Sequence, residues 1–244
     1  MKLLAATTAL LATLSSLVYA DRLPDVHGAP SSAYVKESLR PPEGYNAYDV
    51  LYAKGNRVYQ CNPELKGFQH WYNVQTHAFL YPTQKREEPF DLPGLEIGQV
   101  AMAPLNGTES NPNDPVPVMY YYPDGSWVGT TRPLKTTTME EGRAERGDAG
   151  NLDDHLEPVV FTSDGGYFSH AKYVVRLGSL DGMRPSPEDC TFKGKLVNKP
   201  FTAYFMLYTN QEGEELMAQE KEAWDQLVEE YKIADPVSDT APAY

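Results

Sequence analysis

The sequence predicts a mainly β fold, a single β-sandwich or barrel domain followed by a C-terminal amphipathic α-helix. Short segments rich in Tyr, Val and Phe, separated by turn sequences, predict the strands. A Glu-rich stretch with apolar residues at helical spacing predicts the helix. Strands that alternate with helices, the pattern typical of α/β folds, do not occur in the sequence.

Residues 1–20 have the composition of a secretory signal peptide. Lys2 supplies the positive charge, a Leu- and Ala-rich run follows, and a small-residue cleavage site ends at Ala20. The alternative is a membrane anchor, but the apolar run over 3–17 is shorter than the ~20 residues that a spanning helix needs. We therefore expect a secreted, extracellular protein without membrane insertion.

Residues 21–44 are rich in Pro, Ser and Gly, and we expect an extended N-terminal arm there. The β-rich domain should follow over 45–210. We expect its strands over 47–53 and 56–61 as a hairpin around Gly55, then over 68–74, 77–81, 97–103, 116–122, 126–131, 171–177 and 201–209.

Two of these segments carry a particularly clear signal. Pro123-Asp124-Gly125 predicts a hairpin turn between the strands on either side of it. From Ala171 to Leu177 apolar residues alternate with Lys172 and Arg176, which is typical of a strand with one buried face. Residues 139–156 are Gly-rich and charged, and we expect a long mobile loop there.

The C-terminal helix should occupy 211–234, with a tail over 235–244. Its acidic first turn suits the helix dipole, and Pro236 marks its end. The apolar residues at helical spacing are Leu216, Met217, Trp224, Leu227, Val228 and Tyr231. Such a face either packs on its own domain or binds a partner, and we expect packing on the domain.

The sequence contains two cysteines, Cys61 and Cys190, and both lie outside the signal segment. In an oxidising compartment they can form one disulfide, which would close a long loop. Two buried free thiols are the alternative, and a metal site is disfavoured because no Cys-x-x-Cys spacing occurs.

Asn106-Gly107-Thr108 is a glycosylation sequon in a segment with the composition of an exposed loop.

Several stretches match a known pattern in their order and spacing. They are Pro41-Pro42-Glu43-Gly44, Leu51–Cys61, Asp124-Gly125-Ser126 with Val128-Gly129, Gly166–Ser169 with Tyr173–Leu177, Cys190, and Phe201–Tyr208. Together they resemble an uncharacterised secreted family, known as domain of unknown function 3455. The sequence departs from it at Met119–Tyr122, where the family has a Trp-containing stretch, and in the helix after 210. The resemblance implies secretion and a β-rich fold, but no activity, cofactor or catalytic residue.

Charge and motifs exclude several classes of function. The net charge of −13 disfavours binding to nucleic acid and to anionic membranes. Motifs for dinucleotide, P-loop, zinc-protease and nucleophile-elbow sites are absent, so no cofactor or metal is expected. The sequence does contain residues whose side chains can bind metal ions, although they form no recognised motif. They are His70, His77, His155 and His170, and the acidic residues Asp153, Asp154, Glu157 and Asp164. We expect these side chains to be scattered on the surface rather than gathered around an ion.

Aromatic residues are the best candidates for a binding surface. The possible ligand-facing aromatics are Tyr120, Tyr122, Trp127 and Trp71. Exposed aromatic rings stack on sugars or form protein interfaces, although a strand also turns half of its side chains into the core. We expect a non-enzymatic protein that binds carbohydrate or a cell-surface protein at a cell wall, matrix or host interface. The alternative is a secreted hydrolase that cleaves an extracellular polymer with paired carboxylates.

Overall fold

The computed structural model describes residues 28–66, 70–103, 116–130, 135–136 and 150–231. The strands in this part of the chain are β1 (Tyr45–Cys61), β2 (Trp71–Pro82), β3 (Gly98–Ala103), β4 (Val116–Tyr121), β5 (Trp127–Thr130), β6 (Lys135–Thr136), β7 (His155–Thr162), β8 (Tyr173–Asp181) and β9 (Leu196–Asn210). The helices are the short 3-10 turns η1 (Ser32–Tyr34), η2 (Glu37–Leu39), η4 (Tyr167–His170) and η5 (Pro187–Asp189), and the long α2 (Gln211–Tyr231).

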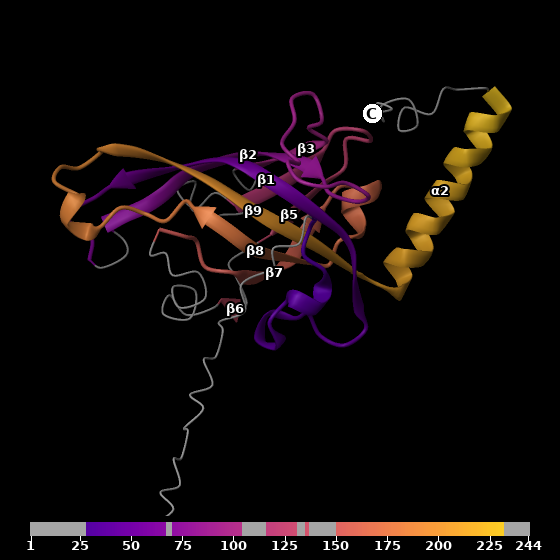
Figure 1. Ribbon diagram of the computed structural model, residues 1–244, viewed down its shortest axis with the longest axis horizontal. Helices are drawn as coiled ribbons and strands as arrows, with labels where there is room; N and C mark the ends of the chain where they lie inside the picture. The colour runs from indigo at the N-terminus through magenta and orange to yellow at the C-terminus, as the bar shows by residue number, and fades with distance from the viewer. Residues whose placement is uncertain (1–27, 67–69, 104–115, 131–134, 137–149, 232–244) are drawn as a thin grey trace, which may run out of the picture.

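The strands form one antiparallel sheet in the order β5-β4-β3-β2-β1-β9-β8-β7-β6 (Figure 1). An additional pairing of β5 with β7 closes the strands from β5 to β7 into a barrel, with β6 paired outside the ring. The predicted mainly β fold, in its barrel form and with a C-terminal helix, is confirmed. Closure leaves no free edge around the ring, so each strand can satisfy its backbone groups on both sides.

The predicted hairpin around Gly55 is wrong, because β1 runs through this position without a turn. A side chain at Gly55 would overlap with the backbone of His77 and Ala78 on β2. The glycine therefore allows a close approach of two strands, and it does not form a turn. In the same way, the two strands expected over 68–74 and 77–81 are one strand, β2.

Four of the other predicted strands are present, whereas β7 was not predicted. The strands expected over 97–103, 116–122, 126–131 and 201–209 correspond to β3, β4, β5 and part of β9. The loop expected over 139–156 lies largely outside the described residues, but its last two residues already belong to β7. We did not predict β7, because Glu157 and Pro158 interrupt its apolar pattern.

Strand β8 is buried on both faces, which corrects the expectation of one buried and one polar face. Val174 belongs to the cluster that fills the barrel, whereas Val175 and Leu177 pack in a second cluster on the outside. Arg176, expected on a polar face, occupies an inward position next to His155 on β7. Its burial requires a polar environment inside the barrel.

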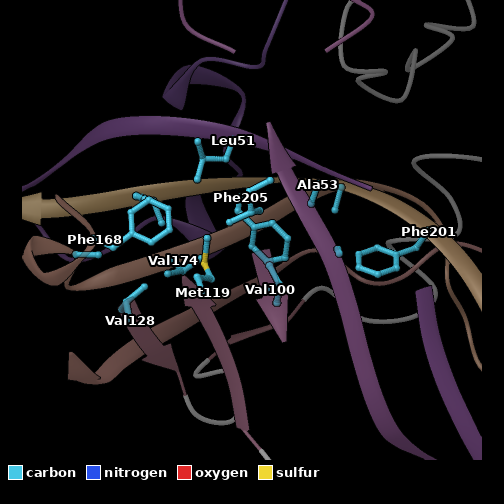
Figure 2. Close-up of a cluster of buried hydrophobic side chains, with 14 of the residues drawn as sticks. Leu51, Ala53, Val100, Met119, Val128, Phe168, Val174, Phe201 and Phe205 are labelled. Carbon is cyan, nitrogen blue, oxygen red and sulfur yellow. The ribbon is translucent and has the colours of Figure 1, made fainter. Parts of the chain in front are cut away.

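The barrel interior holds the main apolar cluster, to which nearly every strand of the ring contributes (Figure 2). Phe168 of η4 enters this cluster, and its ring stacks on Tyr121 at a centroid distance of 4.9 Å. The buried members are Leu51, Ala53, Ala78, Leu80, Val100, Met119, Val128, Leu152, Phe168, Ala171, Val174, Phe201, Ala203, Phe205 and Leu207. Their burial from water is the largest favourable contribution to the stability of the fold.

The N-terminal arm covers the outer face of β1, β9 and β8. Val35 and Leu39 are buried there, together with Phe90 from the segment between β2 and β3. The predicted arm is therefore a packed part of the domain over its described residues. The outer face of β2 to β5, by contrast, carries partly exposed aromatic side chains.

Helix α2 begins directly after β9 and stands away from the barrel (Figure 1). Gly213 is buried, and the carboxylate of Glu220 lies 3.0 Å from Nε2 of His170. Beyond Gly213, the described side chains up to Gln226 are exposed, except for half-buried Met217. The expectation that this helix covers the domain is wrong for these residues. The side chains of Trp224, Leu227, Val228 and Tyr231 lie outside the described part.

Cys61 and Cys190 form a disulfide with a Cα–Cα distance of 5.3 Å, as predicted.

The predicted signal peptide, the sequon at Asn106 and the tail over 235–244 lie outside the described residues. No helix in the described ranges is long and apolar enough to cross a membrane.

Candidate functional site

A row of side chains crosses the outer surface of the barrel from β2 to β5. The register places Phe79 opposite Gln99, Gln99 opposite Tyr120, and Tyr120 opposite Trp127. Phe161 of β7 continues this surface, since its ring lies over Gly129 and 6.1 Å from the ring of Trp127. We call Phe79, Tyr120, Trp127 and Phe161 the aromatic face.

Local geometry explains why these rings stay at the surface. The interior positions of the same strands hold Ala78, Val100, Met119 and Val128, so the alternating residues must point outward. Phe79 is 40% exposed, and the other three rings are half-buried. A side chain at Gly129 would overlap with the ring of Phe161, so glycine there leaves room for that ring.

Polar groups accompany the rings. Nε2 of His77 lies 3.1 Å from Oε1 of Gln99, and the His77 ring packs edge-on against Phe79 at 5.0 Å. The second row of the ladder runs from His77 through Ala101, Val118 and Gly129 to Phe161. Neither row contains Asp, Glu, Lys or Arg, although the chain has 34 acidic and 21 basic residues. Across β2 to β5 the two rows are therefore uncharged, aromatic and able to form hydrogen bonds. On β1 the first row continues from Phe79 to Lys54, which forms an ion pair with Asp91.

The predicted ligand-facing aromatics do not all lie on this surface. Tyr120 and Trp127 belong to the aromatic face, and Tyr122 is 48% exposed just after β4. Trp71 is a correction, because it is only 1% exposed and packs beside the disulfide. Its Nε1 donates a hydrogen bond of 2.9 Å to the carbonyl of Ser186, which explains how the ring is buried without losing its polar partner.

A second constellation lies inside the barrel, where Arg57, Thr130, His155, Glu157 and Arg176 point inward from β1, β5, β7 and β8. We call these five residues the polar cluster. The carboxylate of Glu157 accepts a hydrogen bond of 2.6 Å from the Thr130 hydroxyl, and its other oxygen lies 3.1 Å from Nε2 of His155. Sequence reasoning missed this cluster, because an arginine in a strand normally signals a solvent-facing position.

The pKa shifts in the polar cluster follow from burial and from the two arginines. Desolvation, and then the charges of Arg176 and Arg57, hold the pKa of His155 well below its usual value. The imidazole is therefore neutral at pH 7, and its contact with Glu157 is a hydrogen bond rather than an ion pair. Desolvation also raises the pKa of Glu157, against the effect of the Thr130 hydrogen bond and of both arginines.

A further buried carboxylate, Asp49, lies on β1. It accepts hydrogen bonds from the Val50 amide, the Gln84 amide and the Tyr167 hydroxyl, and desolvation raises its pKa. Glu157 instead contacts Thr130 and His155, so the two carboxylates have different partners. Strands β9 and β8 separate β1, which carries Asp49, from β7, which carries Glu157. The contacts of the two carboxylates do not join them into one acid–base pair, and the hydrolase alternative stays a prediction.

The histidines singled out as metal-ligand types have separate partners. His77 contacts Gln99 on the outer surface, His155 contacts Glu157 inside the barrel, and His170 contacts Glu220 of α2. Within the described ranges, no group of three or more His, Cys, Asp or Glu side chains has an arrangement that could hold a metal ion.

Two of the sequence stretches that resemble a known pattern meet in space. The carboxylate of Asp124, at the tip of the β4–β5 hairpin, accepts hydrogen bonds from the Ser126 and Tyr167 amides at 2.8 and 2.7 Å. The Ser126 hydroxyl accepts one from the Phe168 amide at 3.0 Å. The Asp-Gly-Ser and Gly-Tyr-Phe-Ser stretches therefore form a structural junction that holds η4 and its Phe168 at the barrel.

Comparison with known proteins found no matching family model, no matching curated protein and no matching solved structure.

Proposed function

We propose that this protein is a secreted, non-enzymatic binding protein whose aromatic face holds a neutral carbohydrate polymer at a cell wall, matrix or host surface. The observation that carries the proposal is the row Phe79–Gln99–Tyr120–Trp127 on the outside of the barrel. Secretion is inferred from residues 1–20, and the disulfide is compatible with it.

The chemistry of the aromatic face suits a sugar. A pyranose ring has apolar C–H faces and a rim of hydroxyl groups, so an aromatic ring can cover a face while neighbouring amides bind the rim. Phe79 and Trp127 supply rings, and the Gln99 amide lies between them in the ladder. Successive strands are about 4.8 Å apart, so the row presents several stacking positions along one line. An extended chain of sugar rings could contact more than one of them.

The absence of charge in the two rows favours a neutral glycan over a protein partner. In a chain of net charge −13, an electrostatically steered protein interface would carry charged groups among its aromatic residues, whereas here Lys54, paired with Asp91, stands only at the β1 end of the row. The rigid strands also hold the rings in place before binding, which lowers the entropy cost of ordering them.

The test is binding to a panel of insoluble and soluble neutral polysaccharides, with Trp127→Ala and Phe79→Ala as variants. We expect each to weaken binding at least tenfold, about 1.4 kcal/mol. Phe192→Ala is the matched control, because Phe192 is 60% exposed but precedes β9. Thermal melts check that the variants are folded. Binding that survives the double variant Phe79→Ala/Trp127→Ala would exclude the aromatic face, and sugars released from the panel would favour the hydrolase.

A further inference from the structure

The side-chain amide of Gln99, in the first row of the outer surface, is held in one orientation by its neighbour His77. Nε2 of His77 lies 3.1 Å from Oε1 of Gln99. Because a carbonyl oxygen can only accept a hydrogen bond, Nε2 carries the proton and donates it. The His77 ring also packs edge-on against Phe79, with a centroid distance of 5.0 Å. His77 therefore connects an aromatic ring on its own strand to the amide on β3.

This orientation leaves a hydrogen-bond donor between two aromatic residues. Because Oε1 faces His77, the NH2 group of Gln99 is turned away from it, and within the described ranges this group has no hydrogen-bond partner. Phe79 and Tyr120 lie opposite Gln99 on its two sides in the ladder. Gln99 is half-buried, and a ligand that covers it must supply an acceptor, since a donor that loses water without a new partner is costly.

Among neutral sugars, this arrangement favours those that carry an N-acetyl group. The carbonyl oxygen of an acetamido group only accepts hydrogen bonds, and its methyl group can pack on a flanking aromatic ring. A hydroxyl group in the same place brings no methyl group, and its own hydrogen needs an acceptor. The Tyr120 hydroxyl can donate or accept, so it does not discriminate between the two groups.

We propose that the aromatic face prefers glycans of N-acetylated sugars over glycans that carry only hydroxyl groups. Gln99 determines this specificity, and His77 is its positioning residue. The inference rests on the proposed carbohydrate binding and adds the class of sugar. Across β2 to β5 the two rows contain no carboxylate that could pair with the ammonium group of a deacetylated amino sugar, so the neutral, acetylated form is the one that fits.

The test compares fragments of chitin and of cellulose of equal length, two neutral ligands that differ only in an acetamido or a hydroxyl group on each sugar. In calorimetric titrations of the purified protein, the chitin fragment should have a dissociation constant about five- to tenfold lower, as one net hydrogen bond provides. Gln99→Leu should remove this preference. Gln75→Leu is the matched control and should keep it, because Gln75 is an exposed residue of the same strand as His77 but lies outside both rows.

The role of His77 is tested by rescue and by a double-mutant cycle. His77→Leu removes the donor to Gln99 and should at least halve the preference for the chitin fragment. His77→Gln keeps an amide donor with about the reach of Nε2 and should retain the preference. In the Gln99→Leu background, His77→Leu should change the ratio of the two dissociation constants no further, which separates positioning from a general structural role. Thermal melts check that each variant is folded.

The outcomes distinguish this inference from the proposed function. Equal binding of the two fragments to the wild type, or tighter binding of the cellulose fragment, would overturn the preference and leave carbohydrate binding intact. Binding of neither fragment would overturn it as well, and the polysaccharide panel then decides whether carbohydrate binding survives. A further effect of His77→Leu on the ratio in the Gln99→Leu background would overturn the assignment of His77.

Discussion

At the scale of single residues, Gly55 was predicted to form a turn, but it instead allows strands β1 and β2 to approach closely. Because a Cβ there would overlap with the backbone of β2, Gly55→Ala should destabilise the protein by about 1–3 kcal/mol. Gly28→Ala is the control, since a Cβ at Gly28 has no heavy atom within 4 Å. Urea unfolding of both variants measures the effect, and equal stabilities would show that β1 and β2 can move apart without cost.

His155 predicts a pH dependence of stability. Its folded pKa is depressed by desolvation and by Arg176 and Arg57, whereas the unfolded value is near 6.5. Below that pH the unfolded chain binds a proton that the folded protein does not take up. The free energy of unfolding should therefore fall as the solution is acidified, by at most about 1.4 kcal/mol per pH unit from this group.

Unfolding of His155→Gln between pH 5 and 7 isolates this contribution. The variant keeps a hydrogen-bond donor for Glu157 but cannot titrate, so its stability should fall less than that of the wild type on acidification. Glu157 itself, with its raised pKa, acts in the opposite direction, because its folded form takes up a proton first. Parallel curves for the two proteins would contradict the assignment.

At the scale of elements, the junction between the β4–β5 hairpin and η4 depends on one exposed carboxylate. Asp124 accepts hydrogen bonds from two backbone amides, of Ser126 and Tyr167. Asp124→Ala should cost about 1.5–3 kcal/mol, the range for a hydrogen bond to a charged group. Asp164→Ala, an exposed acid nearby in the chain, should change stability by less than about 0.5 kcal/mol. If thermal melts show similar losses, Asp124 has no special role at this junction.

At the scale of the whole molecule, the disulfide connects the end of β1 to the segment that precedes β9. The two cysteines are 129 residues apart, so the bridge constrains more than half of the chain in the unfolded state. Cys61→Ser/Cys190→Ser should lower the free energy of unfolding by about 2–4 kcal/mol. Intact-mass analysis before and after reduction should detect the bridge in the wild type, and the urea midpoint with and without reductant will measure its contribution. A midpoint unaffected by reductant would contradict this account.

The candidate site was only partly predictable. Tyr120 and Trp127 drew attention because they border a hairpin, and both lie on the outer surface of the barrel. Phe79 and Phe161 were missed, since the side of a strand that faces outward depends on register, which distant strands decide. Trp71 was assigned to the surface for the same reason, although the barrel end and the disulfide bury it.

The sequence by itself determined the strand-rich fold class, the β4–β5 hairpin, the disulfide pair and the C-terminal helix, because these follow from local patterns and from there being only two cysteines. Only the tertiary structure decided that β1 is continuous at Gly55 and that Arg57 and Arg176 face inward. It also decided that the described part of α2 stands away from the domain. The physical reason is the closure of the barrel: pairing β5 with β7 fixes which face of every strand is inside, and no local segment carries that information.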